Sequence, residues 1–346
     1  MNSALALCMA CGLAAASTSL APFLPAPAPP QKIVKMLAPA DFIDRAAIEA
    51  FENSAGWIVA LDSYSSAAEL AERGAGEAYD VVLLRGPALA RRLVAGGLAR
   101  LDRSRLPNSR RVNPIVAAKY GAYDREAAHG VPYGWTAFGL IYDADKFASP
   151  PASFAQALGL ARDAHGANGC GAIWPDAREE SFLVAWKLAG VDPARARPAD
   201  VKSASAVLEK ARAAFQVFAV VDEVGALAKG AACLGAGTAG EAAAAMARGG
   251  DNAPTIRYAY PREGAPLAIY AFAIPANATA PEAAYRLIDA LLEPEAAKAD
   301  ANKAGVNSAL EASDLEMLKR LTPEPTLDAA LMSAMQAEWK RLTSAK

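Results

Sequence analysis

The sequence predicts a mixed α/β chain that folds into two lobes, and three observations lead to this prediction. At 346 residues the chain exceeds what one hydrophobic core usually organises, so about two domains are expected. Short apolar stretches of strand length alternate with stretches of helical spacing, a pattern typical of a mainly parallel sheet covered by helices. This alternation starts near residue 32 and starts again near residue 171.

The first set of elements consists of short apolar strands, each followed by a helix. Its clearest strand is 79–84 (YDVVLL), because a strand buried on both faces of a sheet needs a nearly continuous apolar run. Pro87 marks the first turn of the next helix, where no N–H is needed. The expected strands are 32–37, 57–62 and 79–84, and the expected helices are 41–53, 67–73 and 87–95.

The stretch 131–147, VPYGWTAFGLIYDADKF, predicts a buried strand near the middle of the molecule. Its centre, 135–142, is too apolar to have a wet face, and Asp143 and the polar residues after it turn the chain back toward solvent. We expect the chain to leave the first lobe just after this strand.

The second set repeats the alternation, and Gly249 and Gly250 end one of its helices. Two strands near its end, 255–260 and 267–274, are expected to return the chain. The other expected strands are 171–174, 217–221 and 232–235, and the expected helices are 179–188, 199–215, 223–229, 238–248, 281–292 and 327–342.

The N-terminus predicts an export signal. No charged residue occurs from Ser3 to Ala21, residues 4–16 are apolar, and small residues follow. A Lys or Arg near the start is missing, so an uncleaved anchor is the alternative. However, the apolar run is shorter than the ~20 residues of a membrane span, and five prolines follow within residues 22–30. The signal is therefore expected to be cleaved, between about Ser17 and Lys32.

The four cysteines fall into two pairs. Cys8 and Cys11 lie inside the export segment, and neither follows a convincing lipoprotein cleavage motif. Cys170 and Cys233 would remain after cleavage, and two cysteines of an exported protein are more often bridged than free. A bridge would close a loop of about 64 residues and stabilise the fold by ~4 kcal/mol. Two buried free thiols are the alternative.

Charge and motifs argue against nucleic-acid binding and against catalysis. The 35 basic and 37 acidic residues nearly cancel, and no long basic run occurs, so no nucleic-acid partner is expected. With only His129 and His165, a histidine-based metal site is not expected. The sequence GAGTAG at 235–240 fits GxGxxG, but no acidic residue ends the next strand to hold a ribose. We therefore expect no cofactor, no metal and no enzymatic activity.

Two α/β lobes joined by strand-like crossovers suggest a hinged ligand clamp, and several segments carry a resemblance in support of it. Together and in order, they resemble the periplasmic putrescine- and spermidine-binding proteins of ABC importers, over nearly the whole chain from about Lys32. The putrescine-binding members of that family have a disulfide at the positions that match Cys170 and Cys233. The segments are 101–107 (LDRSRLP), 131–142, 170–180, 233–241 and 260–275 (starting YPREG).

The resemblance implies a type II periplasmic binding protein fold, with ligand trapped between two lobes and two crossover strands as the hinge. It implies a periplasmic monomer that captures a small solute, an amine among the candidates, and delivers it to an ABC permease in the inner membrane. The alternative is a sensor or adaptor on the same fold that has lost polyamine binding. The expected division is a signal peptide and linker at 1–30, a first lobe at 31–140 and 262–346 with the C-terminal helices, and a second lobe at 141–261.

Part of the family's ligand site has matching residues here. Asp41 and Phe42 match an acidic and an aromatic position of the cleft, Glu180 matches an acidic residue, and Glu241 replaces an aspartate. Each acid also has a purely structural interpretation, because Asp41 could cap a helix and the two glutamates could lie in solvated first turns.

Other parts of the family's site are missing. Pro39 and Thr238 stand where the family has tryptophans, Tyr270 stands where it has an aspartate, and Val306 stands where it has a tyrosine. Because a diamine needs carboxylates at both ends and aromatic faces between them, we expect putrescine and spermidine to bind weakly. The remaining candidates are the three acids with Phe42, Tyr64, Trp135, Trp174 and Tyr270, and they favour a ligand with one cationic end and a bulkier neutral or aromatic remainder. For Trp135 a place in the core is an equal alternative.

Overall fold

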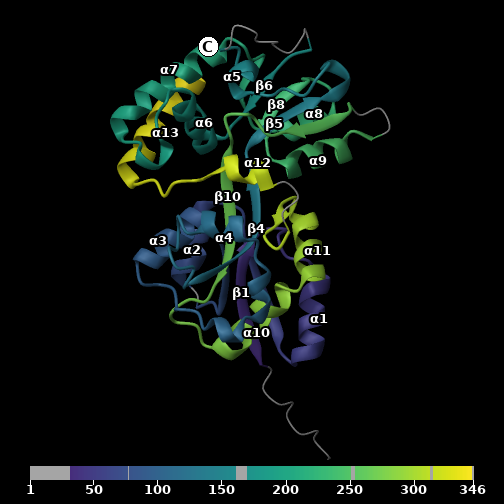
Figure 1. Cartoon of the computed structure of the whole chain (residues 1–346), viewed down its shortest axis with the longest axis vertical. Helices are drawn as coiled ribbons and strands as arrows, with labels where there is room; N and C mark the ends of the chain where they lie inside the picture. Colours follow the sequence, from purple (N-terminus) through teal and green to yellow (C-terminus); the bar gives the residue numbers. More distant parts are fainter. Residues whose placement is uncertain (1–31, 77, 161–169, 251–253, 312–314, 345–346) are drawn as a thin grey trace, which may run out of the picture. The chain divides into compact units, whose positions relative to one another are not determined.

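The computed structural model describes residues 32–344 except 77, 161–169, 251–253 and 312–314 (Figure 1). The predicted export segment and linker at 1–30 lie outside the described residues. Within the described ranges, no helix is both long enough and apolar enough to cross a membrane.

The first lobe is built on a seven-stranded sheet. Its order is β11-β4-β10-β3-β1-β2, with β12 paired to β10. Strands β1, β2 and β3 are parallel, as the alternating pattern predicts, whereas β10 runs antiparallel to both β3 and β4. The strands are β1 (Ile33–Pro39), β2 (Ile58–Tyr64), β3 (Val81–Arg85), β4 (Gly130–Ala137), β10 (Pro266–Ala273), β11 (Asn307–Ser308) and β12 (Thr322–Pro323).

Local signals fix the helices of this lobe. Asp44 accepts a hydrogen bond from the N–H of Ala46 and begins α1, and Gly56, at φ 69°, ends it in the left-handed region that glycine adopts without strain. The helices are α1 (Arg45–Ala55), α2 (Ala67–Gly76), α3 (Gly86–Val94), α4 (Pro114–Tyr120), α10 (Pro281–Leu291), α11 (Pro294–Ala304) and α12 (Leu315–Arg320), with short 3-10 turns at Arg103–Arg105 and Pro107–Arg111.

The second lobe contains two small sheets. In one, β5 is antiparallel to both β8 and β9, and in the other β6 is parallel to β7. The strands are β5 (Gly139–Asp143), β6 (Ile173–Pro175), β7 (Val217–Val220), β8 (Leu234–Gly237) and β9 (Ile256–Ala259). The helices are α5 (Phe154–Ala157), α6 (Arg178–Leu188), α7 (Val201–Arg212), α8 (Glu223–Ala228), α9 (Ala239–Arg248) and α13 (Ala329–Ser344), with 3-10 turns at Ala144–Lys146, Pro193–Arg195 and Pro198–Asp200.

The strand predicted at 135–142 is two strands, because the chain changes sheets in its middle. Strand β4 ends at Ala137 in the first sheet and β5 begins at Gly139 in the second. Between them, the N–H of Phe138 donates to the carbonyl of Pro266 at 3.0 Å, beside the return strand β10. Figure 1 shows β4 and β10 side by side where the chain passes between the lobes. Since both pieces are buried, the sequence carries no charged residue to mark the break.

The C-terminal helix packs on the second lobe, whereas the prediction grouped it with the first. The ring of Trp339 in α13 lies 6.4 Å from that of Phe182 and 5.4 Å from that of Phe218. Arg341 pairs with Glu209 of α7 at 2.6 Å. The apolar face of α13 thus buries itself against α6 and α7, a choice of partner that helical spacing alone does not reveal. The predicted boundary at 140/141 falls inside β5, which pairs with β8 and β9 of the second lobe, because the chain changes sheets at Phe138. The boundary at 261/262 remains our proposal.

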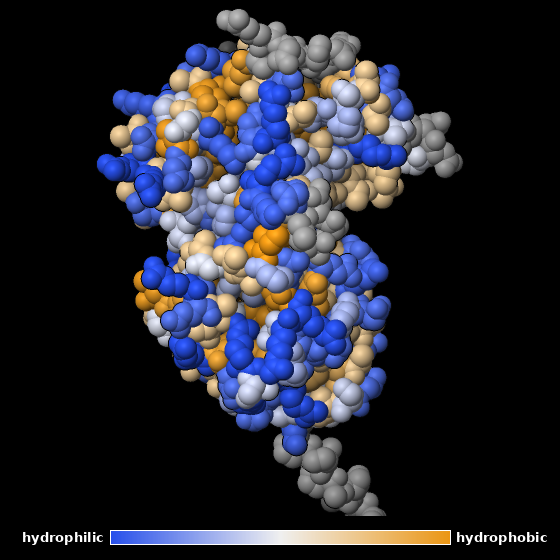
Figure 2. Space-filling model, viewed as in Figure 1, coloured by the Kyte–Doolittle hydropathy of each residue, from blue (hydrophilic) through white to orange (hydrophobic). Residues whose placement is uncertain are grey.

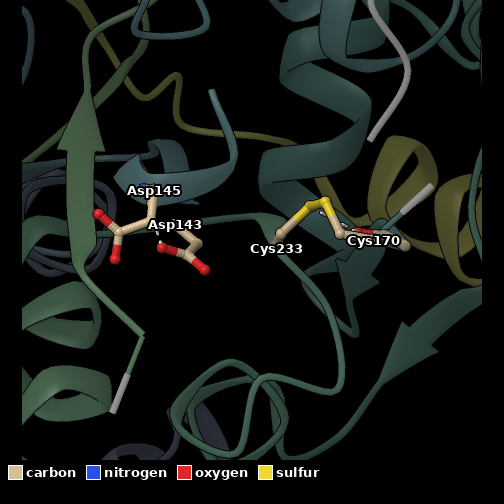
Figure 3. The surroundings of a disulfide bond; sticks show 5 residues. Asp143, Asp145, Cys170 and Cys233 are labelled. Atoms are coloured by element: carbon tan, nitrogen blue, oxygen red, sulfur yellow. Dashed lines mark hydrogen bonds between the residues drawn. A yellow bond between two sulfur atoms is a disulfide. The ribbon is translucent and has the colours of Figure 1, made fainter. Parts of the chain in front are cut away.

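A disulfide joins Cys170 to Cys233, as predicted, and Figure 3 shows it near Asp143 and Asp145. The Cα atoms are 5.6 Å apart, and the N–H of Cys233 donates to the carbonyl of Gly171 at 3.1 Å. Asp143 at the end of β5 donates its N–H to the carbonyl of Cys233. The bridge therefore ties the chain before β6 to the chain before β8, across the two small sheets.

Candidate functional site

A cleft of about 1010 Å³ lies between the lobes. The first lobe contributes the end of β1, the N-terminal turns of α2 and α3, and Tyr270 of β10. The second lobe contributes the first turn of α6 and three side chains of α13, namely Met332, Gln336 and Trp339. The segment after β12 supplies Glu324 to the same cleft. A solute in this space would therefore contact both lobes.

Arg85 forms the polar centre of the cleft. It is the last residue of β3, so its side chain projects from the end of a buried strand. Its Nη2 donates to Oε1 of Glu180 at 2.8 Å, and its Nε donates to Oε2 of Glu324 at 2.7 Å. Nη2 also contacts the second oxygen of Glu324, which makes that pair bidentate. One guanidinium thus joins the first lobe, α6 of the second lobe and the connecting segment.

The surroundings keep this guanidinium charged. Burial alone would lower the pKa of Arg85, but Glu324 and Glu180 hold that pKa well above its usual value. Burial also raises the pKa of Glu324, and the nearby Arg85 opposes that rise. The side chain of Glu324 is 8% exposed, that of Glu180 19% and that of Arg85 38%. The arginine therefore faces open space while its partners lie deeper.

Three of the predicted site residues line the cleft, namely Tyr64, Glu180 and Tyr270. Tyr64 donates its hydroxyl to the carbonyl of Leu83 at 2.9 Å, and burial raises its pKa. Burial also raises the pKa of Tyr270, so both phenols are neutral. Pro39 lines the cleft too.

Phe42, Trp135 and Trp174 are core residues and do not line this cleft. Phe42 is 4% exposed, and its ring lies 4.8 Å from that of Tyr270, so it supports a cleft residue from behind. Trp135 is 1% exposed, in agreement with the core alternative. Trp174 donates its Nε1–H to the hydroxyl of Ser181 at 2.8 Å.

Asp41 and Glu241 are exposed and also lie outside the lining of this cleft. Asp41 sits in a turn at φ 57° and does not cap α1, because Asp44 does. Glu241 forms a capping box with Thr238 at the start of α9, and its Oε2 accepts the N–H of Thr238 at 2.6 Å. A ligand-binding role for either acid stays a prediction.

Comparison with known proteins identifies the family. Residues 46–331 match the family model described as bacterial extracellular solute-binding protein. The chain belongs to this family.

Two relatives have the same sequence identity to this solute-binding protein. It is 27% identical to the putrescine-binding periplasmic protein SpuD of Pseudomonas aeruginosa, over 91% of this chain and 93% of the relative. It is also 27% identical to the putrescine-binding periplasmic protein PotF of Escherichia coli, over 77% of this chain and 74% of the relative.

Solved structures confirm the type II binding protein fold predicted from the resemblance. The spermidine/putrescine substrate-binding protein PotD of Streptococcus pneumoniae superposes with a TM-score of 0.77 at 17% identity, covering 90% of this chain and 98% of that structure. The PotD lipoprotein of Treponema pallidum superposes with a TM-score of 0.74 at 18% identity, covering 90% and 99%. At these identities the likeness establishes the fold and not the ligand.

Sequence reasoning missed several polar residues of this solute-binding protein's cleft, among them Arg85, Asp176 and Glu324. The sequence did contain an indication of Arg85, because this charged residue directly follows the buried run VVLL. Ligands of α/β proteins bind at such carboxyl ends of parallel strands. Asp176 follows β6 in the same way and accepts the Nε1–H of Trp339 at 2.7 Å. Nothing in the sequence indicated a cleft position for Glu324, since it lies between two prolines in a connecting segment.

Proposed function

We propose that this solute-binding protein works in the periplasm, as a monomer, and delivers a small solute to the permease of an ABC importer. The family supports solute binding, and the named relatives support the periplasm and import. No cofactor and no catalytic step form part of the proposal. The mechanism is differential affinity, because a ligand that contacts both lobes favours the closed arrangement that a permease recognises.

The observation that carries the proposal is the cleft of about 1010 Å³, which is lined from both lobes. That volume exceeds what one small solute fills, so closure around the ligand is expected to displace water. The walls combine apolar faces from Leu70, Met332 and Trp339 with hydroxyls from Tyr64 and Tyr270. This mixture suits a small solute with both a polar and an apolar part.

The polyamines named for the relatives are not the ligands we propose for this chain. Glu180, the one predicted acid in the cleft, already has a cation in Arg85. Tyr270, in place of a family aspartate, supplies a neutral phenol. An amine-bearing solute with a bulkier remainder stays a prediction, with organic acids, amino acids and sugars as the other classes to be screened.

A thermal-shift screen of the purified protein against these classes tests the proposal. A genuine ligand should raise the melting temperature, bind in calorimetry with one site, and reduce the radius of gyration in small-angle scattering. Absence of any stabilising solute across the classes would contradict solute capture.

Mass spectrometry of the cellular protein tests export, since a chain that keeps Met1 to Ala16 would contradict signal cleavage.

A further inference from the structure

The Arg85 guanidinium has the contacts that a bound cation would have. It lies between two carboxylates that come from separate parts of the chain, Glu180 in α6 and Glu324 after β12. The pair with Glu324 is bidentate, the arrangement that a planar guanidinium makes with a carboxylate. Two neighbouring carboxylates in a half-buried space need such a positive partner, because otherwise they repel each other and lose solvation.

We propose that Arg85 is a built-in cation that occupies the cleft's carboxylate pair and thereby excludes diamines and guanidinium compounds from that pair. Arg85 is then the residue that sets ligand specificity. The inference rests on the proposed function of this cleft as the solute site. The solute that the protein selects binds in the part of the cleft beside Arg85.

Three features separate this role from that of an ordinary structural ion pair. The Arg85 side chain is 38% exposed and lines the cleft, so its removal opens onto existing space that a small molecule can reach. Its partner Glu324 is held in place by a backbone bond, because the N–H of Glu324 donates to the carbonyl of Leu267 at 3.1 Å. Glu180 lies in the first turn of α6, an eleven-residue helix. The backbone positions that carry the two carboxylates are therefore fixed by contacts that do not involve Arg85.

The proposal predicts a gain of binding when the cation is removed. Arg85→Ala should leave Glu180 and Glu324 facing an empty space of about side-chain size, ready to accept methylguanidine or 1,4-diaminobutane. We expect each probe to bind the variant at least about tenfold more tightly than wild type in calorimetry at low salt. The same probes should raise the melting temperature of the variant more than that of wild type.

Arg91→Ala is the matched control. Arg91 is also a cleft-lining arginine, it lies in α3 six positions after Arg85, and it is exposed. If loss of any positive charge attracted cations, both variants would gain equally, and that result would overturn the proposal. A folded Arg85→Ala variant without any gain would overturn it too, as would micromolar binding of either probe by wild type.

A second variant keeps the test decisive if Arg85→Ala does not fold. In Arg85→Ala/Glu324→Gln the buried acid becomes neutral, and Glu180 remains to attract a cation. This double variant should bind methylguanidine more tightly than wild type, and adding Glu180→Gln should abolish the gain. A folded double variant with wild-type affinity would contradict the role of Arg85.

The outcomes separate this inference from the proposed function. If the solute screen of wild type fails but Arg85→Ala gains cations, solute capture is contradicted and the exclusion by Arg85 stands. If wild type binds a solute but Arg85→Ala gains no cation, the specificity role alone falls.

Discussion

Gly240 in the first turn of α9 lies against Gly305, the residue that ends α11. A Cβ placed on Gly240 would overlap the Gly305 carbonyl oxygen, and one placed on Gly305 would lie 2.7 Å from the Cα of Gly240. Helix α9 belongs to the second lobe and α11 to the first, so two backbones of different lobes touch where neither has a side chain. Gly305 also adopts φ 64°, which favours glycine.

Gly240→Ala should therefore hinder closure. The added methyl forces a backbone shift that costs about 1–3 kcal/mol, and it does so only when the lobes are together. We expect roughly tenfold or weaker binding of the solute identified by the screen, with an unchanged melting temperature for the free protein if its lobes can separate. Gly74→Ala in α2 is the control, because its Cβ would meet only the flexible end of Arg92 at 3.3 Å. Equal affinities for both variants would show that the glycine contact does not matter for closure.

The disulfide should stabilise the second lobe substantially. Because 63 positions separate Cys170 from Cys233, the chain-entropy model values the bridge at about 4 kcal/mol. Cys170→Ser/Cys233→Ser should lower the free energy of unfolding by roughly that amount in urea denaturation. Dithiothreitol should lower the melting temperature of wild type and leave that of the double variant unchanged. Two titrating thiols in the denatured, unreduced protein would contradict the bridge.

Glu223 should make stability depend on pH. It is 7% exposed, and burial, helped by the nearby Glu241, raises its pKa from 4.5 to about 9, although the N–H of Ala236 donates to its Oε1 at 2.8 Å. The folded state thus holds a proton that the unfolded chain releases near pH 4.5. The stabilising contribution is complete below pH 4.5 and is lost as pH rises toward 9, with a slope of at most about 1.4 kcal/mol per pH unit.

Urea denaturation at pH 5, 7 and 8.5 tests this dependence. Glu223→Gln cannot ionise, so its free energy of unfolding should fall less than that of wild type between pH 5 and 8.5. Glu72→Gln, on the exposed surface of α2, is the matched control and should follow wild type. A parallel pH dependence of Glu223→Gln and wild type would show that Glu223 is ionised in the folded protein.

Glu241→Gln distinguishes a ligand role from a capping role. Glutamine can still accept the N–H of Thr238, so the capping box and the melting temperature should be kept. If Glu241 only caps α9, the affinity for the solute should change less than twofold. A loss of tenfold or more at unchanged stability would instead support the predicted contact with a cationic ligand. Thr238→Ala, which removes the other half of the box, should cost about 1 kcal/mol of stability.

Much of the fold followed from local pattern. The apolar run 79–84 and the proline after it predict β3 and α3, which the structure shows at Val81–Arg85 and Gly86–Val94. Periodicity identifies such elements because a strand or helix must bury one face wherever it packs. The pattern did not reveal the change of sheet at Phe138, since no charged residue in the buried run marks where the chain leaves one sheet for the other.

The sequence by itself determined the two-lobe class, the paired cysteines and the candidate acids, because each of these depends on residue type and order along the chain. Only the tertiary structure decided which acids face the cleft and which cation they meet. Arg85 is 95 positions from Glu180 and 239 from Glu324, and α13 reaches the cleft only by packing on α6 and α7. Ion pairs act over a few ångströms in space, so partners this far apart in the chain become apparent only once the packing has brought them together.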